Sequence, residues 1–392
     1  MEGISQTNQL APAAVAPLAA TAEGAPSFWP SVLLAFSATC ITTGIMWDIS
    51  WHETIGRDTF WTPAHMCIYL GGVLGGCVGG WLAIQYTFLD RAKGEASGVG
   101  VFGARAPLGA WVVIWSALAM VTSAPFDNWW HNAYGLDVKI ISPPHSLLGM
   151  GMAGICFGAL LTVLTRQNRL PDGRGSGLFI YVGGVFLTMA AVFIMEYYFP
   201  NQQHGMMFYM VASLAFPIRL VMMGRAARTS WPATRMALVY LVFSCAMSWI
   251  LPLFPAQPKL APIFNPVTHM VPPPFPLLLI IPAMAVDFIL RKLDRGPGWW
   301  NVPLALILGA AFLAVFMLAQ WYFSEFLLSP YAENWFFVGN RAWSYVDNLG
   351  DWTRNYWDAG FKFKLFALAW LFASFQCWLG LMVGGWMRKV QR

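Results

Sequence analysis

Residues 47–65 read WDISWHETIGRDTFWTPAH, a run dense in carboxylates and imidazoles in a chain that has only 10% charged residues and six histidines. The run returns at 126–145 as FDNWWHNAYGLDVKIISPPH. Both copies follow the order Asp-x3-His-x3-Gly-x-Asp and close on a proline-containing turn and a second His. The repeated residues are Asp48, His52, Asp58 and His65 in the first copy and Asp127, His131, Asp137 and His145 in the second. An internal repeat of these residue types indicates metal binding.

The spacing within each copy suits a single ion. Residues four apart on a helix share a face, with Cβ atoms roughly 5–6 Å apart, so the first Asp and the first His of each copy can reach one ion together. Proline favours the first turn of a helix, so the closing His of each copy should open the next helix and fold back toward the other two. The predicted ligands are Asp48, His52 and His65 in the first copy and Asp127, His131 and His145 in the second.

Four further residues receive supporting roles. Asp58 and Asp137 are predicted to orient an imidazole rather than to bind the ion. Glu196 and His204 flank the YYFPNQQ turn and are also predicted to support the ligands rather than to bind the ion. We call these four supporting residues the outer layer of the site. The alternative interpretation of each such residue, taken singly, is a helix cap or a hydrogen-bonded interfacial group.

Composition sets the class of protein, because 58% of the residues are hydrophobic and 16% are aromatic. Apolar spans of about 20 residues, the length that crosses a hydrocarbon core, predict an all-α polytopic transmembrane bundle with about ten spans. We divide the chain into a disordered tail at 1–27, a metal-motif core with two internal repeats at 28–254, and a transmembrane extension at 255–392. The predicted spans are roughly 28–47, 64–88, 108–125, 144–165, 177–199, 205–224, 234–254, 274–290, 302–328 and 362–386.

The basic residues predict the orientation. Sixteen of the 23 Lys and Arg fall in loops or at span ends on one side, including Arg219 and Arg225 around the loop after the sixth span. By the positive-inside rule this side is cytoplasmic, and both termini lie there. The net charge of +5 comes from these flanking residues, so no nucleic-acid partner is expected and the lipid bilayer is the expected environment.

The first motif resembles the signature of the C subunit of the copper membrane monooxygenases, the family of the particulate methane and ammonia monooxygenases. DISWHETIGRDTFWTPAH has the family's Asp-x3-His, the same spacing to the next His, and an Arg-Asp-Thr and a Thr-Pro-x-His in the expected places. The second motif falls on the family's Asn-x3-His-x13-His spacing, with Asp127 where the family usually has Asn. The resemblance covers about 28–250 and leaves the rest of the chain unassigned.

This resemblance implies copper, other membrane monooxygenase subunits as partners, and O2 with a small apolar or ammonia-like substrate. It also implies a bacterial inner membrane with the metal sites on the periplasmic side. Ligand chemistry alone leaves iron and zinc open, because imidazole suits all three metals. The alternative function is a non-catalytic membrane protein that binds metal for assembly or delivery. A transporter is disfavoured, since ionisable groups inside the spans, such as Asp287 and Glu325, are isolated.

Overall fold

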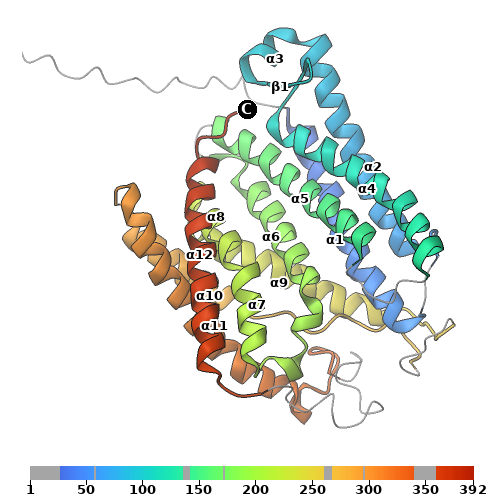
Figure 1. The fold of residues 1–392 in the computed structure, drawn as a ribbon, viewed down its shortest axis with the longest axis vertical. Helices are drawn as coiled ribbons and strands as arrows, with labels where there is room; N and C mark the ends of the chain where they lie inside the picture. The colour runs from blue at the N-terminus through green and yellow to red at the C-terminus, as the bar shows by residue number, and fades with distance from the viewer. Residues whose placement is uncertain are drawn as a thin grey trace, which may run out of the picture.

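The computed structural model describes residues 27–56, 59–135, 142–170, 173–259, 267–294, 296–339 and 359–392. Within these ranges, nine helices are long and apolar enough to cross a membrane. The predicted all-α polytopic bundle is therefore confirmed (Figure 1). The α-helices are α1 (Phe28–Thr54), α2 (Pro63–Ile84), α3 (Arg91–Ser97), α4 (Leu108–Tyr134), α5 (Pro143–Arg169), α6 (Ser176–Phe193), α7 (Met206–Ala215), α8 (Pro217–Ala226), α9 (Pro232–Ile250), α10 (Ile280–Leu293), α11 (Asn301–Leu327) and α12 (Phe363–Met387). A π-turn (Gln85–Leu89) prolongs α2, and β1 (Val99–Val101) and β2 (Ala104–Ala106) form an antiparallel hairpin. Short 3₁₀ turns occupy Met195–Tyr197, Pro200–Gln202, Leu251–Leu253, Gly298–Trp300 and Pro330–Ala332.

The sequence repeat is also a repeat of structure. Helices α1 and α2 form one antiparallel pair, α4 and α5 form the other, and the two pairs pack together through α2 with α4 and α1 with α5. The second helix of each pair begins in the same way. Thr62 caps α2 and Ser142 caps α5, each accepting a hydrogen bond from the backbone N–H three residues later, and a proline follows each cap.

Close helix contacts recur at matching positions in the two pairs. A Cβ on Gly71 would lie 2.6 Å from the carbonyl oxygen of Ser37, and a Cβ on Gly151 would lie 2.8 Å from that of Ser116. Each glycine stands six residues after the closing His of its motif, and each serine stands 11 residues before the motif's first Asp. Glycine lets two membrane helices approach through their backbones, so the repeat includes the packing between the paired helices.

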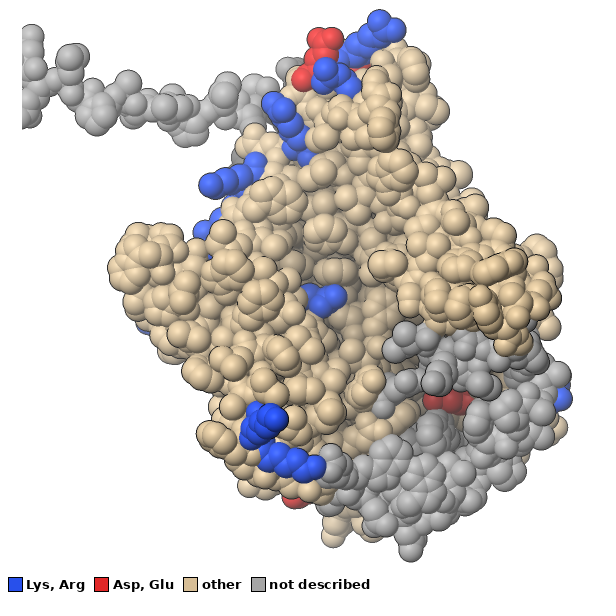
Figure 2. All heavy atoms as spheres, in the orientation of Figure 1, with Lys and Arg blue, Asp and Glu red and all other residues tan. Residues whose placement is uncertain are grey.

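Basic side chains mark one end of the bundle. Asn168 at the end of α5 donates hydrogen bonds to the carbonyls of Met387 and Val390, and Arg166 stacks on Phe28 at the start of α1. The ends of α5 and α12 and the start of α1 therefore meet at one end, where α3 and the hairpin also lie (Figure 1). Basic side chains gather there (Figure 2). We call it the basic end.

The eighth predicted span, 274–290, is wrong as a continuous helix. Helix begins only at Ile280, and α10 has 14 residues, which is about 21 Å at 1.5 Å per residue and short of a ~30 Å core. Residues 271–277 are buried and extended, and they include four prolines at 272, 273, 274 and 276. Proline lacks the N–H that a helix interior needs, so the proline cluster prevents a helix despite its apolar composition.

Side chains of three helices satisfy the backbone of this extended segment, as irregular backbone inside a membrane protein requires. Acceptors from α1, α9 and α11 receive its N–H groups: Thr54 Oγ1 from Val271 (2.8 Å), Tyr240 Oη from Leu277 (2.9 Å) and Gln320 Oε1 from Leu278 (2.8 Å). Ser50 of α1 donates to the Val271 carbonyl. Helix α1, which carries the first motif, therefore also anchors the segment at 271–277. It does so through Ser50 and Thr54, which lie on a different face of the helix from Asp48 and His52.

The sixth predicted span is broken at its middle. Helix α7 ends at Ala215 and α8 begins at Pro217. Arg219, which the sequence places near the end of this span beside the following loop, lies inside α8, seven residues before that helix ends.

Candidate metal centre

The last turns of α1 and the first turn of α2 bring the three residues of the first motif together. Asp48 and His52 lie one turn apart near the end of α1, and His65 is the third residue of α2. His65 Nε2 lies 3.3 Å from Asp48 Oδ1, and His52 Nε2 lies 3.8 Å from Asp48 Oδ2. One carboxylate thus contacts both imidazoles, through a different oxygen for each.

A backbone hydrogen bond fixes the ring of His65. Its Nδ1 lies 3.0 Å from the carbonyl oxygen of Thr59. A carbonyl can only accept, so Nδ1 carries the proton and donates. In a neutral imidazole, Nε2 then has a lone pair that faces the carboxylate of Asp48. Two acceptors at this distance need a cation between them, which is either a proton on Nε2 or a metal ion.

The separation of each imidazole from the Asp48 carboxylate is compatible with a shared ion. Asp48 Oδ1 is a buried oxygen for which no described residue provides a hydrogen bond. Bonds of about 2.0–2.2 Å to one tetrahedral ion place two donor atoms about 3.4 Å apart, close to the separations of 3.3 and 3.8 Å. The Thr59 carbonyl on the far side of His65 is the usual partner of a metal-binding imidazole.

The second motif repeats half of this arrangement. His145 is the third residue of α5, and its Nε2 lies 3.5 Å from Asp127 Oδ1 of α4. His131 lies in the last turn of α4, but its side chain is outside the described part of the structure. The pair is also more open, because Asp127 and His145 are 31% and 37% exposed, against 18% and 22% for Asp48 and His65.

Both motifs emerge at the end opposite the basic end. Position 52 is 24 residues along α1 from Phe28, about 36 Å at 1.5 Å per residue. Helix α4 likewise starts beside the hairpin and carries its motif in its final turns. Figure 1 shows the ends of α1 and α4 at the same, lower side of the bundle.

The predicted outer layer is described only in part. Asp58 and Asp137 lie outside the described residues, as does the side chain of Glu196. His204 is buried and contacts α11, where Ser324 Oγ lies 3.1 Å from its Nδ1 and Glu325 Oε1 lies 3.4 Å from its Nε2. Burial lowers the pKa of His204, and the hydrogen bond and negative charge of Glu325 act against that shift.

Sequence reasoning missed the supports of the first motif. The Thr59 carbonyl has no signal in the side-chain pattern, because a backbone oxygen exists at every residue. Ser50 and Thr54 did offer a signal, since their i, i+4 spacing places them together on α1. Their role depends on the proline segment, which a hydropathy analysis assigns to a helix.

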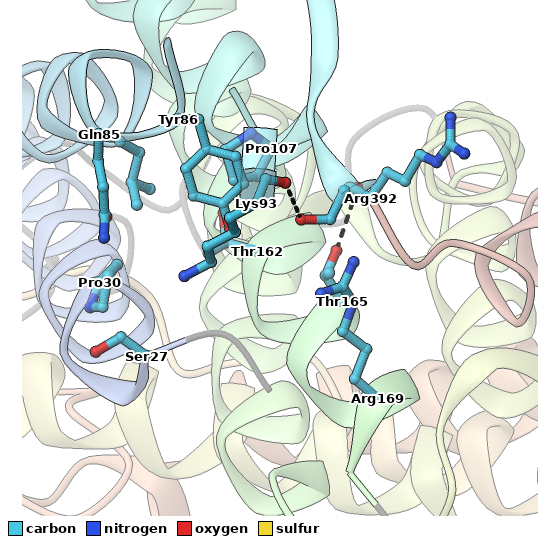
Figure 3. Close-up of a pocket in the computed structure, with 12 residues that line it drawn as sticks. Ser27, Pro30, Gln85, Tyr86, Lys93, Pro107, Thr162, Thr165, Arg169 and Arg392 are labelled. Atoms are coloured by element: carbon cyan, nitrogen blue, oxygen red, sulfur yellow. Dashed lines mark hydrogen bonds between the residues drawn. The ribbon is translucent and has the colours of Figure 1, made fainter. Parts of the chain in front are cut away.

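Within the described ranges, no group of three or more His, Cys, Asp or Glu side chains is arranged to hold a metal ion. The first motif is two carboxylate–imidazole pairs that share Asp48. At the basic end, a hollow lined by residues that include Tyr86, Lys93 and Thr165 (Figure 3) encloses only about 20 Å³, room for about one water molecule.

The comparisons with known proteins give no match to a family model, to a curated protein or to a solved structure.

Proposed function

We propose that this chain is a metal-binding integral membrane protein whose ion is held by Asp48, His52 and His65 at the end of the bundle opposite the basic end. The observation that carries the proposal is the pair of facing acceptors at this site, Asp48 Oδ1 and the lone pair of His65 Nε2 at 3.3 Å. The His52 ring, with 48% of its side chain exposed, has room to close on the ion by a change of rotamer.

The motif resemblance supports copper as the metal and an oxygen-dependent monooxygenase as the assembly, with this chain as one subunit beside others. A bound copper ion would supply redox chemistry toward O2. The chain's own residues have definite tasks. Asp48 would offset part of the ion's charge, Thr59 holds the His65 ring in one tautomer, and the apolar spans would admit a small apolar substrate from the bilayer. An ammonia-like substrate would approach from the exposed side of His52.

Orientation and location belong to the same proposal. With the basic end in the cytoplasm, the motif end faces the periplasm of a bacterial inner membrane. A site there can receive metal without passage across the membrane.

Metal analysis of the purified protein with His52→Ala and His269→Ala tests the proposal. His52→Ala should lose bound metal, the Cu(II) electron paramagnetic resonance signal and any oxygenase activity while it stays in the membrane. His269 bonds to its neighbour Thr268 and lies in a loop, so His269→Ala should keep all three. If His52→Ala binds metal like the wild type, the site is structural and the proposal is wrong.

One observation favours the alternative of metal delivery without turnover. The half-exposed His52 leaves one side of the site accessible from the membrane surface, which suits exchange of the ion with a partner. Rapid removal of the metal by a soluble chelator would favour delivery, and slow removal would favour a resident redox metal.

A further inference from the structure

A basic side chain lies at the middle of the membrane on the face formed by α6 and the α7–α8 pair. Arg219 Nη1 donates a hydrogen bond to the carbonyl of Ala215, and its guanidinium carbon lies 4.8 Å from the centre of the Phe186 ring. Ala215 stands 11 residues before the end of α8, and Phe186 stands 10 residues after the start of α6. Both counts place the guanidinium about 15 Å from the basic end, near the centre of a ~30 Å core.

The direction of this side chain is unusual. Long basic side chains in membrane helices normally turn toward the nearer membrane surface. Arg219 instead reaches back toward Ala215, which is farther from the basic end. The α7–α8 break explains the hydrogen bond from the Arg219 guanidinium to Ala215. In a continuous helix the backbone N–H of Arg219 would bond to the Ala215 carbonyl, but here it bonds to the carbonyl of Phe216. The Ala215 carbonyl is therefore left for the side chain.

The rest of the guanidinium is not explained within the chain. Its Nε is buried and has no acceptor among the described residues. The ion pairs between described residues do not include Arg219, although Arg225, six residues on, pairs with Asp294 at 2.6 Å. A buried cation without a counter-charge costs several kcal/mol, so an ionisable group at this depth is by default a functional site.

The guanidinium opens into an apolar hollow of about 340 Å³ between α6 and the α7–α8 pair. That volume lies within the range of roughly 300–1,000 Å³ of ligand sites, which are mostly apolar with a few polar groups. Apart from Arg219, the lining is apolar: Ala190, Phe193, Ile194, Val211, Leu214 and Ala215. The hollow therefore combines apolar walls with one fixed positive charge.

We propose that this hollow is the docking site for a transmembrane helix of another subunit that carries an Asp or Glu at mid-membrane depth. Charge complementarity selects this occupant. Ala190 and Ala215 are small, which lets a helix approach closely, and a carboxylate on that helix would supply the counter-charge that Arg219 lacks among the described residues.

Two other occupants fit less well. Among the described residues, a second copy of this chain offers no suitable carboxylate. Asp287 in α10 is 1% exposed and accepts hydrogen bonds from Ala233 and Thr234. Glu325 contacts His204 and lies in the last turn of α11, away from mid-membrane depth. The acid group of a lipid lies at the membrane surface, about 15 Å from this guanidinium. A side chain on a spanning helix is held at the required depth.

The inference extends the multi-subunit part of the proposed function, but it does not use the metal site. The two are separable in one variant. Arg219→Gln should bind metal at Asp48 like the wild type, so failure of one proposal leaves the other standing.

The test uses the full-length protein in phosphatidylcholine vesicles and two dansyl-labelled, Leu/Ala-rich transmembrane peptides without tryptophan. The peptides differ only in a central Glu or Gln, and association is measured by energy transfer from the protein's tryptophans. The Glu peptide should associate about tenfold more tightly than the Gln peptide with the wild type. This preference should fall below twofold in Arg219→Gln. In Arg219→Glu the charges are exchanged, so a third peptide with a central Arg should associate more tightly than the Glu peptide.

Two matched variants separate charge from shape. Arg291 stacks on Trp231 at the basic end, away from the hollow, so Arg291→Gln should keep the tenfold preference. Leu214→Trp fills the hollow and keeps the charge of Arg219, so it should weaken association of the Glu peptide with the protein. Equal association of the Glu peptide with wild type and Arg219→Gln would overturn the proposal, as would no association at all. Displacement of that peptide by oleate but not by oleyl alcohol would reassign the hollow to a lipid acid and overturn it too.

Discussion

Replacing Asp48 by Asn tests the metal centre at the one residue that contacts both imidazoles. The substitution keeps the shape of the side chain but removes its charge and turns one oxygen into an NH₂ group, which cannot bind a cation. Changes to outer-layer partners of metal ligands typically cost 10- to 100-fold in affinity. Loss of the only anionic ligand should cost more, so we expect metal affinity to fall by more than about 100-fold, or about 2.8 kcal/mol.

The measurement is a titration of purified protein with Cu(II) and Zn(II) against a competing chelator of known affinity. Asp127→Asn is the matched control from the second motif and should leave metal affinity at the first motif unchanged. Neither variant should unfold the protein, since the fold depends on apolar helix packing and both residues lie near helix ends. If Asp48→Asn binds metal within threefold of the wild type, the assignment of the first motif as a metal centre is refuted.

Three further results are expected. Gly71→Ala should lower the melting temperature, because its Cβ would lie 2.6 Å from backbone and side-chain atoms of α1, whereas Gly80→Ala in the same helix meets nothing within 4 Å and should be neutral. Thr54→Val should cost about 1–3 kcal/mol of stability, because it leaves the buried N–H of Val271 without an acceptor; an unchanged melting temperature would contradict this. The pKa of His204 is lowered in the folded protein, so as the pH falls the unfolded chain binds a proton at His204 before the folded chain does. The free energy of unfolding should therefore fall as the pH drops through about 6.5, the ordinary pKa of His. It should level off once His204 is protonated in the folded protein too. His204→Gln should flatten that melting profile between pH 8 and pH 5, and an unchanged slope would show that another group controls it.

The sequence predicts the helical class and the placement of the first motif because both depend on local rules. Apolar runs of spanning length form helices in a bilayer. The i, i+4 spacing places Asp48 beside His52, and the proline before His65 sets the start of the next helix. The 3.3 Å contact between Asp48 and His65 follows from those rules together with a tight antiparallel pair.

Two features could not be predicted because they depend on partners distant in sequence. The segment at 271–277 is as apolar as a spanning helix, and its extended form requires acceptors such as Tyr240 and Gln320 from other helices. Arg219 falls near the end of the predicted sixth span, and its composition signal is the same as that of the loop arginines that follow it. Its contacts with Ala215 and Phe186 depend on the break before Pro217 and on packing against α6.

The internal repeat separates the needs of the fold from those of the site. The alternative interpretation of the Asp and His residues was helix capping, yet Thr62 and Ser142 supply the caps of α2 and α5. The close approach within each pair is made by glycines, such as Gly71 and Gly151. Neither role requires an imidazole on the third helical residue or a carboxylate 3.3–3.5 Å from it across the pair. Capping and helix packing therefore do not account for these residues, and the metal site proposed above would.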